Sequence, residues 1–271
     1  MIPRAYITSW RTNAPWPSNE NVEQDLVLSR ALVEIFQNET VSKQTLFRGG
    51  TALHKLIFKT AARYSEDIDL VQRDAGQIGP MVQAIRETLD PWLGNPKRNQ
   101  GQGRFTLLYR FETAYEPVST RRLKIEINTR EHFAVLGHSA VPFVVESPWF
   151  SGSTSIPVFE LDELLGTKLR ALFQRKKGRD LFDLWFALNS GNVDCGRVLE
   201  CFSQYMRNES SAVSRAEFEA NMAMKMKSPE FLNDHHALMP RDAHYAPQVA
   251  WEIVKTRLIE KLPGEPWKGQ V

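Results

Sequence analysis

Two aspartates separated by one isoleucine stand in the stretch RYSEDIDL, residues 63–70. Alternation along a strand puts Ser65, Asp67 and Asp69 on one face and leaves mainly apolar residues on the other. Two carboxylates about 6–7 Å apart on a strand repel each other unless a cation lies between them. Mg²⁺ prefers hard oxygen ligands and keeps coordination sites for water and phosphate. The pattern therefore predicts a site for Mg²⁺ (or Mn²⁺) at Asp67 and Asp69, with a solvated strand face as the alternative.

A glycine turn precedes this stretch, in the sequence FRGGTALHK. Gly49 and Gly50 allow the backbone to approach a bulky ligand closely. A helix that follows such a turn presents free amides and its positive dipole end to an anion, and the Thr51 hydroxyl can add a hydrogen bond. An ordinary strand-to-helix turn is the alternative. A phosphate-binding turn and a carboxylate pair one helix apart together predict a site for a nucleoside triphosphate.

A third acidic residue stands in LKIEIN, residues 123–128. Alternation puts Lys124, Glu126 and Asn128 on one face of this predicted strand. If the strand neighbours the aspartate strand, Glu126 completes a three-carboxylate site for two metal ions. Such a site activates the attacking oxygen and stabilises the leaving pyrophosphate. The alternative is a half-exposed strand whose polar side faces water.

A lysine lies inside an apolar helical stripe in the stretch FELDELLGTKLRALFQRKKGRDLFDLWFAL. Because an unpaired buried charge is costly, Lys168 must pair with an acid, reach past its neighbours to water or bind an anion. Asp180 lies near the start of the next predicted helix, where it can act as a cap, pair with Lys168 or act as a base. Asp183 lies opposite the apolar residues of that helix, and we expect it to be solvated.

Basic residues cluster between these two predicted helices, in the segment QRKKGR. Smaller clusters occur near residues 97–104 and 121–122. Such clusters suit an RNA or polyphosphate backbone, whereas a solvated helix end is the alternative for each of them. The predicted RNA-binding residues are Arg175, Lys176, Lys177 and Arg179.

The elements that must position these residues follow from periodicity. We expect a helix over 22–38, a strand over 45–50, a helix over 51–62, the aspartate strand over 63–72 and a helix over 78–89. The stretch 94–104 is predicted to be a loop, and 104–111 and 121–128 are predicted strands. Beyond about residue 157 the pattern is mainly helical. The expected domains are residues 1–155, a core with an N-terminal helix, and residues 156–271, a helical domain that completes the active-site cleft.

Composition restricts the class of protein. The chain has 271 residues with a net charge of +2, so its total charge names no partner. No apolar run is long enough to cross a bilayer, and the N-terminal stretch has no apolar signal-peptide core. The two cysteines, Cys195 and Cys201, show no metal-ligand spacing. We therefore expect a cytoplasmic protein with no membrane partner and no disulfide framework.

These motifs together resemble the AbiEii/AbiGii toxin family of nucleotidyltransferase-like proteins. The matching segments are FRGGTALHK, RYSEDIDL, LKIEIN and ELLGTKLRALFQRKKGRDLFDL, and they extend from about Phe47 to Leu188. The opening YITSWRTNAPW is also similar to the family. The resemblance implies an α+β protein with a nucleotidyltransferase-fold mixed sheet flanked by helices, followed by a mainly helical C-terminal domain. It also implies a toxin of a toxin–antitoxin or abortive-infection system, with a cognate antitoxin as partner.

The resemblance carries specific roles onto this chain. Many nucleotidyltransferases have Gly-Ser at the turn, and the Gly-Gly-Thr found here keeps a hydroxyl one position later. Lys168 matches the nucleotide-contacting lysine of the family, and Asp180 matches its helical catalytic aspartate. The other residues carried over are the metal ligands Asp67 and Asp69, with Glu126 as a third, and the nucleotide-binding residues Gly49, Gly50, Thr51 and Ser65.

The predicted function is the metal-dependent transfer of a nucleoside monophosphate from a nucleoside triphosphate to an RNA, and the family resemblance implies the 3′ end of tRNA. A first alternative is a nucleotidyltransferase that modifies a protein or a small molecule at the same site. A second alternative is a pseudo-enzyme that binds nucleotide or antitoxin without catalysis. The aspartate pair together with Lys168 argues against this second alternative.

Overall fold

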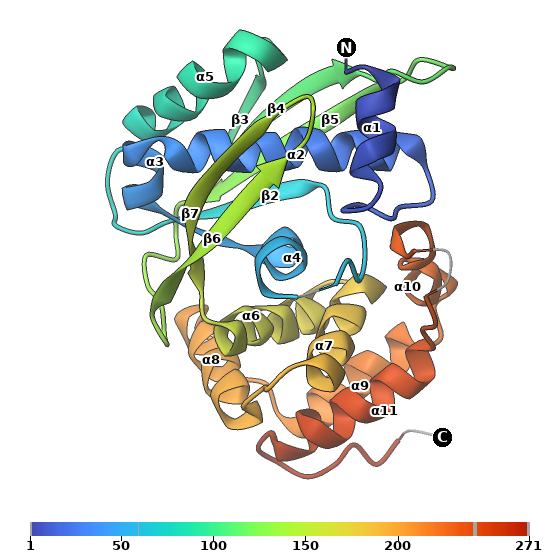
Figure 1. The fold of residues 1–271 in the computed structure, drawn as a ribbon. Helices are drawn as coiled ribbons and strands as arrows, with labels where there is room; N and C mark the ends of the chain where they lie inside the picture. Colours follow the sequence, from blue (N-terminus) through green and yellow to red (C-terminus); the bar gives the residue numbers. More distant parts are fainter. Residues whose placement is uncertain (1, 59, 241–242, 270–271) are drawn as a thin grey trace. The chain divides into compact units, whose positions relative to one another are not determined.

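A computed structural model describes residues 2–58, 60–240 and 243–269 of the chain (Figure 1). The chain divides into two compact units, Met1–Phe159 and Glu160–Val271. The expected boundary after residue 155 therefore lies four residues before the division that the structure has. Each unit is described by itself below.

The first unit is built on a mixed seven-stranded sheet in the order β3-β4-β5-β2-β1-β7-β6. Within it, β2 is antiparallel to β1 and parallel to β5, and β1 is parallel to β7. The outer pairs β3–β4, β4–β5 and β6–β7 are antiparallel. The strands are β1 Thr45–Arg48, β2 Asp67–Gln72, β3 Lys97–Gly101, β4 Arg104–Glu112, β5 Thr120–Asn128, β6 His138–Glu146 and β7 Ser151–Phe159.

Helix α2, Asn19–Gln37, supplies much of the core of this unit and runs across the sheet in Figure 1. Ser18, just before the helix, is its N-cap residue, and the Ser18 side chain accepts a hydrogen bond from the backbone N–H of Asn21. Thirteen of its nineteen residues are buried, and it packs on β7, β6, β2 and β5. Helices α1 Arg4–Trp10, α3 Glu39–Gln44 and α5 Gly79–Leu93 pack beside α2. The predicted helices over 22–38 and 78–89 are thus present.

Strand β2 shows the alternation that the sequence predicted. Ile68 and Leu70 are buried, whereas Asp67 and Asp69 are half-buried. The strand begins at Asp67 and is shorter than the predicted stretch 63–72. Residues 63–66 form the loop that precedes it. One face of β2 consequently contributes to the apolar core, and the other carries carboxylates.

One prediction about the sheet is wrong, and one strand was not predicted. The stretch 94–104, expected to be a loop, contains β3, which pairs with β4. All residues of β3 are exposed, so an edge strand of this kind leaves no apolar alternation in the sequence. Residues 151–159, to which the sequence analysis assigned no strand, form β7, which makes a hairpin with β6. The first half of β7 is polar and exposed, and only its last four residues are buried.

The second unit is helical, as the sequence predicted. Helix α6 packs on α7, α8 and α9, and α7 packs on α11. Gly166 permits the contact between α6 and α8, because a β-carbon at this position would lie 2.6 Å from the Cβ of Cys201. The helices are α6 Leu161–Gln174, α7 Gly178–Ser190, α8 Cys195–Asn208, α9 Arg215–Lys225, α10 Pro229–Asn233 and α11 Pro247–Arg257.

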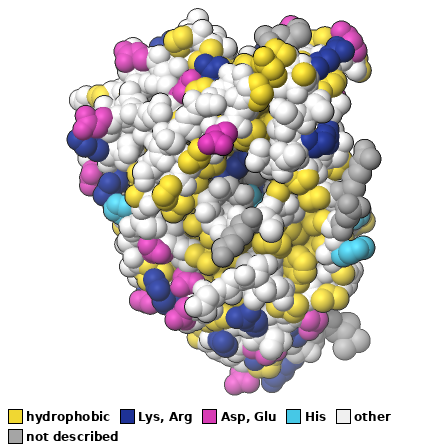
Figure 2. Space-filling model, viewed as in Figure 1, with side chains coloured by type: hydrophobic (Ala, Val, Ile, Leu, Met, Phe, Trp, Pro, Cys, Tyr) yellow, Lys and Arg dark blue, Asp and Glu magenta, His cyan; other side chains and the backbone are white. Residues whose placement is uncertain are grey.

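On the face seen in Figure 2, acidic and basic side chains are interspersed with each other, and most of them lie toward the edges of the view. This agrees with the net charge of +2 for the whole chain. Among the described residues, none of the helices has the length and apolar character needed to cross a membrane.

Candidate active site

The two aspartates of β2 and the glutamate of β5 lie on the same face of the sheet. The register of these parallel neighbours places Asp69 opposite Glu126 and Asp67 opposite Lys124. Residues that lie directly opposite on paired strands point to the same face. The structure therefore places the three acidic residues that the sequence predicts on one face of the sheet, and it adds a lysine beside them.

Lys124 lies between two of these carboxylates. Its Nζ is 3.0 Å from Oδ2 of Asp67 and 3.7 Å from Oε2 of Glu126. The side chains of Lys124, Asp67 and Glu126 are 33%, 38% and 33% exposed, respectively. Sequence analysis placed Lys124 on this face without giving it a role, because alternation shows which residues share a face but not which side chains meet.

The pKa values of Asp67 and Lys124 are both raised, for different reasons. Burial raises the pKa of the Asp67 carboxyl, the charge of Lys124 opposes this only in part, and the charge of Asp69 raises the pKa further. For Lys124, burial alone would lower the pKa, but attraction to Asp67, Asp69 and Glu126 outweighs it, and the pKa is raised. Lys124 therefore stays charged, while Asp67 binds a proton more readily than an ordinary aspartate.

The donor set of this face fits a hard divalent cation. Its carboxylate oxygens are the ligands that Mg²⁺ prefers, and the Lys124 ammonium shows that a cation is stabilised between Asp67 and Glu126. Over residues 2–58, 60–240 and 243–269, no three His, Cys, Asp or Glu side chains are grouped closely enough to hold a metal ion. The predicted roles of Asp67, Asp69 and Glu126 as metal ligands thus stay predictions.

The glycine turn lies against the carboxylate face. Gly49 has a φ of +83°, and a β-carbon there would lie 2.3 Å from Oδ2 of Asp69. A β-carbon at Gly50 would lie 2.5 Å from Nη2 of Arg63 and 3.2 Å from Oγ of Ser65. The two glycines therefore make room for the carboxylate of Asp69 and the guanidinium of Arg63 beside the turn. The close approach of a ligand to these glycines stays a prediction.

The hydroxyl of Thr51 ties the turn to β2. Its Oγ1 donates a hydrogen bond to the backbone carbonyl of Asp67 and lies 2.8 Å from Oγ of Ser65. Because the single hydroxyl proton of Thr51 is donated to the backbone, the predicted contacts of Thr51 and Ser65 with a phosphate stay predictions. The helix after the turn is shorter than expected: α4, Gly49–Ala52, continues into a π-helical turn, Leu53–Ile57.

The second unit contains a buried cluster of charges between α6 and α7. The Lys168 ammonium is 3.2 Å from Oδ1 of Asp180 and 2.9 Å from Oδ2 of Asp183. Arg175 donates to both carboxylate oxygens of Asp180, over 2.6 and 2.7 Å. The side chain of Lys168 is 7% exposed, and those of both aspartates are 0% exposed. Of the possibilities that the sequence left open, the structure shows the ion pair between Lys168 and Asp180.

The prediction that Asp183 is solvated is wrong. Asp183 follows Asp180 by three residues in α7, so the two carboxylates lie on the same side of the helix. Apolar periodicity classed Asp183 as a surface residue because it gives no information about a charged partner on another helix. The ammonium of Lys168 supplies that partner.

The charges around Asp180 set the ionisation of this cluster. Burial alone would raise the pKa of Asp180, but the charge of Lys168 and the hydrogen bonds and charge of Arg175 outweigh it and hold the pKa below its ordinary value.

Lys225, which sequence analysis missed, donates to the backbone carbonyls of Leu172 and Phe173 near the end of α6. Burial lowers the pKa of Lys225 to about 8.

The predicted RNA-binding segment has acidic partners within its own unit. Besides the pair of Arg175 with Asp180, Lys176 lies 3.6 Å from Glu230, and Lys177 lies 3.7 Å from Asp234. Arg179 lies 4.0 Å from the same Asp234 carboxylate. A phosphate that bound here would have to displace these partners, and the role of the segment in RNA binding stays a prediction.

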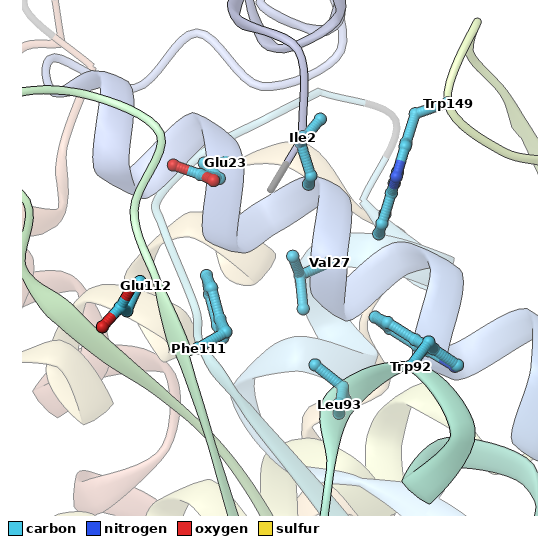
Figure 3. A pocket seen from close by; sticks show the side chains of 8 residues that line it. All are labelled: Ile2, Glu23, Val27, Trp92, Leu93, Phe111, Glu112 and Trp149. Atoms are coloured by element: carbon cyan, nitrogen blue, oxygen red, sulfur yellow. The ribbon is translucent and has the colours of Figure 1, made fainter.

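An aromatic pocket of about 310 Å³ in the first unit lies apart from the predicted site residues (Figure 3). The guanidinium of Arg30, on α2, stacks 4.1 Å from the ring centre of Trp92 and 4.7 Å from that of Trp149. This stacking joins α2 to the end of α5 and to the β6–β7 turn. The pocket is lined by Ile2, Glu23, Val27, Trp92, Leu93, Phe111, Glu112 and Trp149.

A family model described as "Nucleotidyl transferase AbiEii toxin, Type IV TA system" matches residues 30–253. The chain belongs to this family. The match contains every predicted site residue and extends over most of both units. The predicted enzyme class is therefore confirmed: this AbiEii-family protein is a nucleotidyltransferase, and its family is that of the toxins of type IV toxin–antitoxin systems.

Solved structures confirm the predicted fold class. The nucleotidyltransferase toxin MenT4 from Mycobacterium tuberculosis H37Rv is 17% identical, with a TM-score of 0.68 over 97% of this chain and 91% of that one. A putative nucleotidyltransferase from H. pylori is 18% identical, with a TM-score of 0.54 over 90% of this chain and 96% of that one. JHP933 from Helicobacter pylori is 18% identical, with a TM-score of 0.52 over 90% and 93%. The comparison with curated proteins found no match.

Proposed function

We propose that this AbiEii-family nucleotidyltransferase transfers a nucleoside monophosphate from a nucleoside triphosphate to the 3′ end of an RNA. One observation carries the proposal. The carboxylates of Asp67, Asp69 and Glu126 share one face of two neighbouring parallel strands, and a glycine turn lies directly against Asp69. A tRNA is the acceptor that the family resemblance implies, and an antitoxin is the partner that we propose opposes the activity.

Asp67 and Asp69, with Glu126 as a third ligand, are the residues that would hold a divalent metal ion. When bound, such an ion neutralises the charge of the triphosphate and favours ionisation of the attacking hydroxyl. The first turn of a helix has backbone N–H groups without intrahelical partners, so the turn at Gly49 and Gly50 leading into α4 offers donors to the triphosphate. Positioning and charge neutralisation perform most of the catalysis in a reaction of this kind.

The reaction is a displacement at the α-phosphorus. The terminal hydroxyl oxygen of the RNA forms a new bond to this phosphorus while the bond from the phosphorus to the bridging oxygen breaks. Pyrophosphate leaves with the electron pair of the broken bond, and the hydroxyl proton passes to a carboxylate.

The second unit contributes charge in this proposal. Asp180 and Asp183 pair with the Lys168 ammonium, which has three protons, and a bound triphosphate would use the third. We assign Lys168 to the triphosphate and Asp180 to the positioning of Lys168. Asp180 is a weak base because its pKa is lowered. Contact of the RNA with residues 175–179 would exchange their acidic partners for phosphates.

The test is incubation of the protein with labelled nucleoside triphosphates and total RNA, with Mg²⁺ and with a chelator. We expect labelled RNA in Mg²⁺, no label with the chelator and no label with Asp69→Asn. Label on a protein or a small molecule would replace RNA as the acceptor. Nucleotide binding without any transfer by the wild-type protein would overturn the proposal in favour of a pseudo-enzyme.

A further inference from the structure

A groove of about 400 Å³ begins at Asp67 and extends along β5, entirely within the first unit. It includes none of the predicted RNA-binding residues, and basic side chains dominate its β5 wall. The residues that bear on its chemistry are Glu66, Asp67, Arg121, Arg122 and Lys124.

Two of these basic residues form a row that leads away from the carboxylates. Arg122, Lys124 and Glu126 occupy alternate positions of β5 and therefore share a face. Successive members of the row are about 6–7 Å apart. Starting from the pair of Glu126 and Asp69, the row reaches Lys124 first and Arg122 second. A chain of phosphates that left the reaction centre along β5 would meet one cation at each step.

Lys124 of this groove pairs with Asp67 and Glu126, whereas the two arginines lack, among the described residues, ion-paired carboxylates like those of residues 175–179. Arg122 is exposed, and within the described part of the chain it forms no ion pair. Arg121 donates to neutral acceptors, namely Oε1 of Gln24 at 3.0 Å and Oδ1 of Asn21 at 2.5 Å. Glu66, on the other wall, accepts a hydrogen bond from the hydroxyl of Tyr64. An anion in the groove is therefore attracted to the β5 wall.

The order of the strands separates this groove from the glycine turn. β2 has β1, which leads into the turn, on one side and β5 on the other. In the proposed function, the turn on the β1 side receives the triphosphate. The groove on the β5 side is then left for the other substrate.

We propose that this groove binds the backbone phosphates of the acceptor RNA just before its 3′-terminal nucleotide, and that Arg122 is a phosphate contact there. The assignment rests on the proposed function, because it is the acceptor of that reaction that the groove would hold. Arg122 touches neither the reacting atoms nor the carboxylates and thus serves to position and bind the acceptor. Lys124, one step closer, would contact the next phosphate.

The first test uses transfer kinetics of Arg122→Ala with a single-stranded RNA acceptor. We expect the KM for RNA to rise about tenfold at low salt, while kcat and the KM for the nucleoside triphosphate change less than about twofold. Arg122→Lys should recover part of the loss because it keeps the charge. The matched control is Arg207→Ala, which removes an exposed arginine of α8 outside the groove and outside the basic clusters, and it should leave the KM for RNA unchanged.

The second test uses fluorescence anisotropy with labelled single-stranded RNA of about ten nucleotides, a length in the range of known single-strand sites. The slope of log affinity against log salt should become less negative by about 0.7 for Arg122→Ala, the value for one lost phosphate contact. An unchanged affinity and slope, or an equal effect of Arg207→Ala, would overturn the assignment.

A rise in the KM for the triphosphate instead of the RNA would also overturn it and would place the triphosphate in the groove. These results are distinguishable from failure of the proposed function. If the wild-type protein labels no RNA, the transfer proposal fails, whereas the anisotropy measurement still decides whether Arg122 binds an RNA backbone.

Discussion

Lys124 in the first unit and Lys168 in the second each stand between two carboxylates, and they differ in their access to water. Lys124 and its partners are about a third exposed, whereas Lys168 is 7% exposed and its partners are 0% exposed. A partly hydrated ion pair can exchange partners at small cost, because water replaces the lost contact between ammonium and carboxylate. A buried pair cannot, because each charge left behind is desolvated. A lysine between two carboxylates thus suits ligand exchange in one unit and a fixed arrangement in the other.

The comparison is tested most strongly by removing the ammonium from the buried cluster. Lys168→Met should destabilise the protein by about 3–5 kcal/mol, because it leaves Asp180 and Asp183 buried without that charge. Urea denaturation followed by circular dichroism measures this. The control is Lys176→Met, whose half-exposed side chain pairs with Glu230 in the same unit and should change the stability by less than about 1 kcal/mol. Equal effects of the two substitutions would remove the distinction between buried and exposed pairs.

The second test concerns the open cluster and catalysis. Asp69→Asn should reduce nucleotide transfer about 100- to 1000-fold while the unfolding free energy changes little, because the carboxylate acts on ligands in a half-exposed position. Transfer assays at saturating Mg²⁺ together with a denaturation curve give both quantities. Glu112→Gln, an exposed acid of β4, serves as the control and should stay fully active. Full activity of Asp69→Asn would exclude this face as the active site.

An intermediate effect is expected at the glycine turn. Gly49→Ala should cost about 1–3 kcal/mol, because φ is +83° and the new methyl group would collide with the Asp69 carboxylate. Transfer should fall as well, since Asp69 must move. Gly76→Ala is the matched control, because no atom lies within 4 Å of its β-carbon position. Thermal denaturation of the two variants shows the contrast, and a Gly49→Ala protein as stable as Gly76→Ala would mean that the turn lies farther from Asp69.

Removing the ammonium from the open cluster should have a smaller effect on stability. Lys124→Met is expected to change the unfolding free energy by less than about 1 kcal/mol, because Asp67 and Glu126 can be hydrated once the ammonium is gone. The same urea experiment used for Lys168→Met gives the direct comparison. A loss of about 3 kcal/mol or more would show that water does not reach this cluster.

The pH dependence of stability should have opposite signs in the two clusters. The pKa of Asp67 is raised on folding, so the folded state binds the proton more tightly, and stability falls as the pH rises from the unfolded to the folded pKa. Asp67→Asn should therefore gain stability relative to wild type across this window. The pKa of Asp180 is lowered, so its contribution is present above the unfolded pKa and is lost as the pH falls through the folded pKa.

Melting temperatures of wild type, Asp67→Asn and Asp180→Asn between about pH 3 and 7 measure these differences. The melting temperature of Asp180→Asn should lie below that of wild type at pH 7, and the difference should become smaller in acid. The gap between Asp67→Asn and wild type is expected to be the smallest of all these effects, because the Asp67 side chain is 38% exposed. If both variants differed from wild type in melting temperature with the same sign, the assigned directions of the pKa shifts would be contradicted.

Local periodicity was sufficient where one face of an element is buried. It identified α2, the carboxylate face of β2, and the apolar stripe around Lys168, because burial of one face imposes a period on the sequence. It failed for β3, which is exposed along its whole length and has no such period. The polar first half of β7 was missed for the same reason.

The partners within the site could not be predicted, because they depend on contacts between segments far apart in the chain. The pair of Lys124 with Asp67 depends on the register of β5 against β2, which no local pattern records. The burial of Asp183 depends on a lysine of another helix. The sequence thus indicated the residue types of the candidate site, and the fold decided which of them meet.

Strand β2 has a neighbour on each side in the sheet, β1 on one side and β5 on the other, and both pairings fix the number of its residues. A single residue inserted into β2 would turn the following side chains over, so that a carboxylate would enter the apolar core and Leu70 would face the substrate side. Evolution can therefore change the side chains of this strand one at a time, but it cannot change their number. The insertion of one codon, compensated by a deletion a few codons later, would be more damaging here than several substitutions.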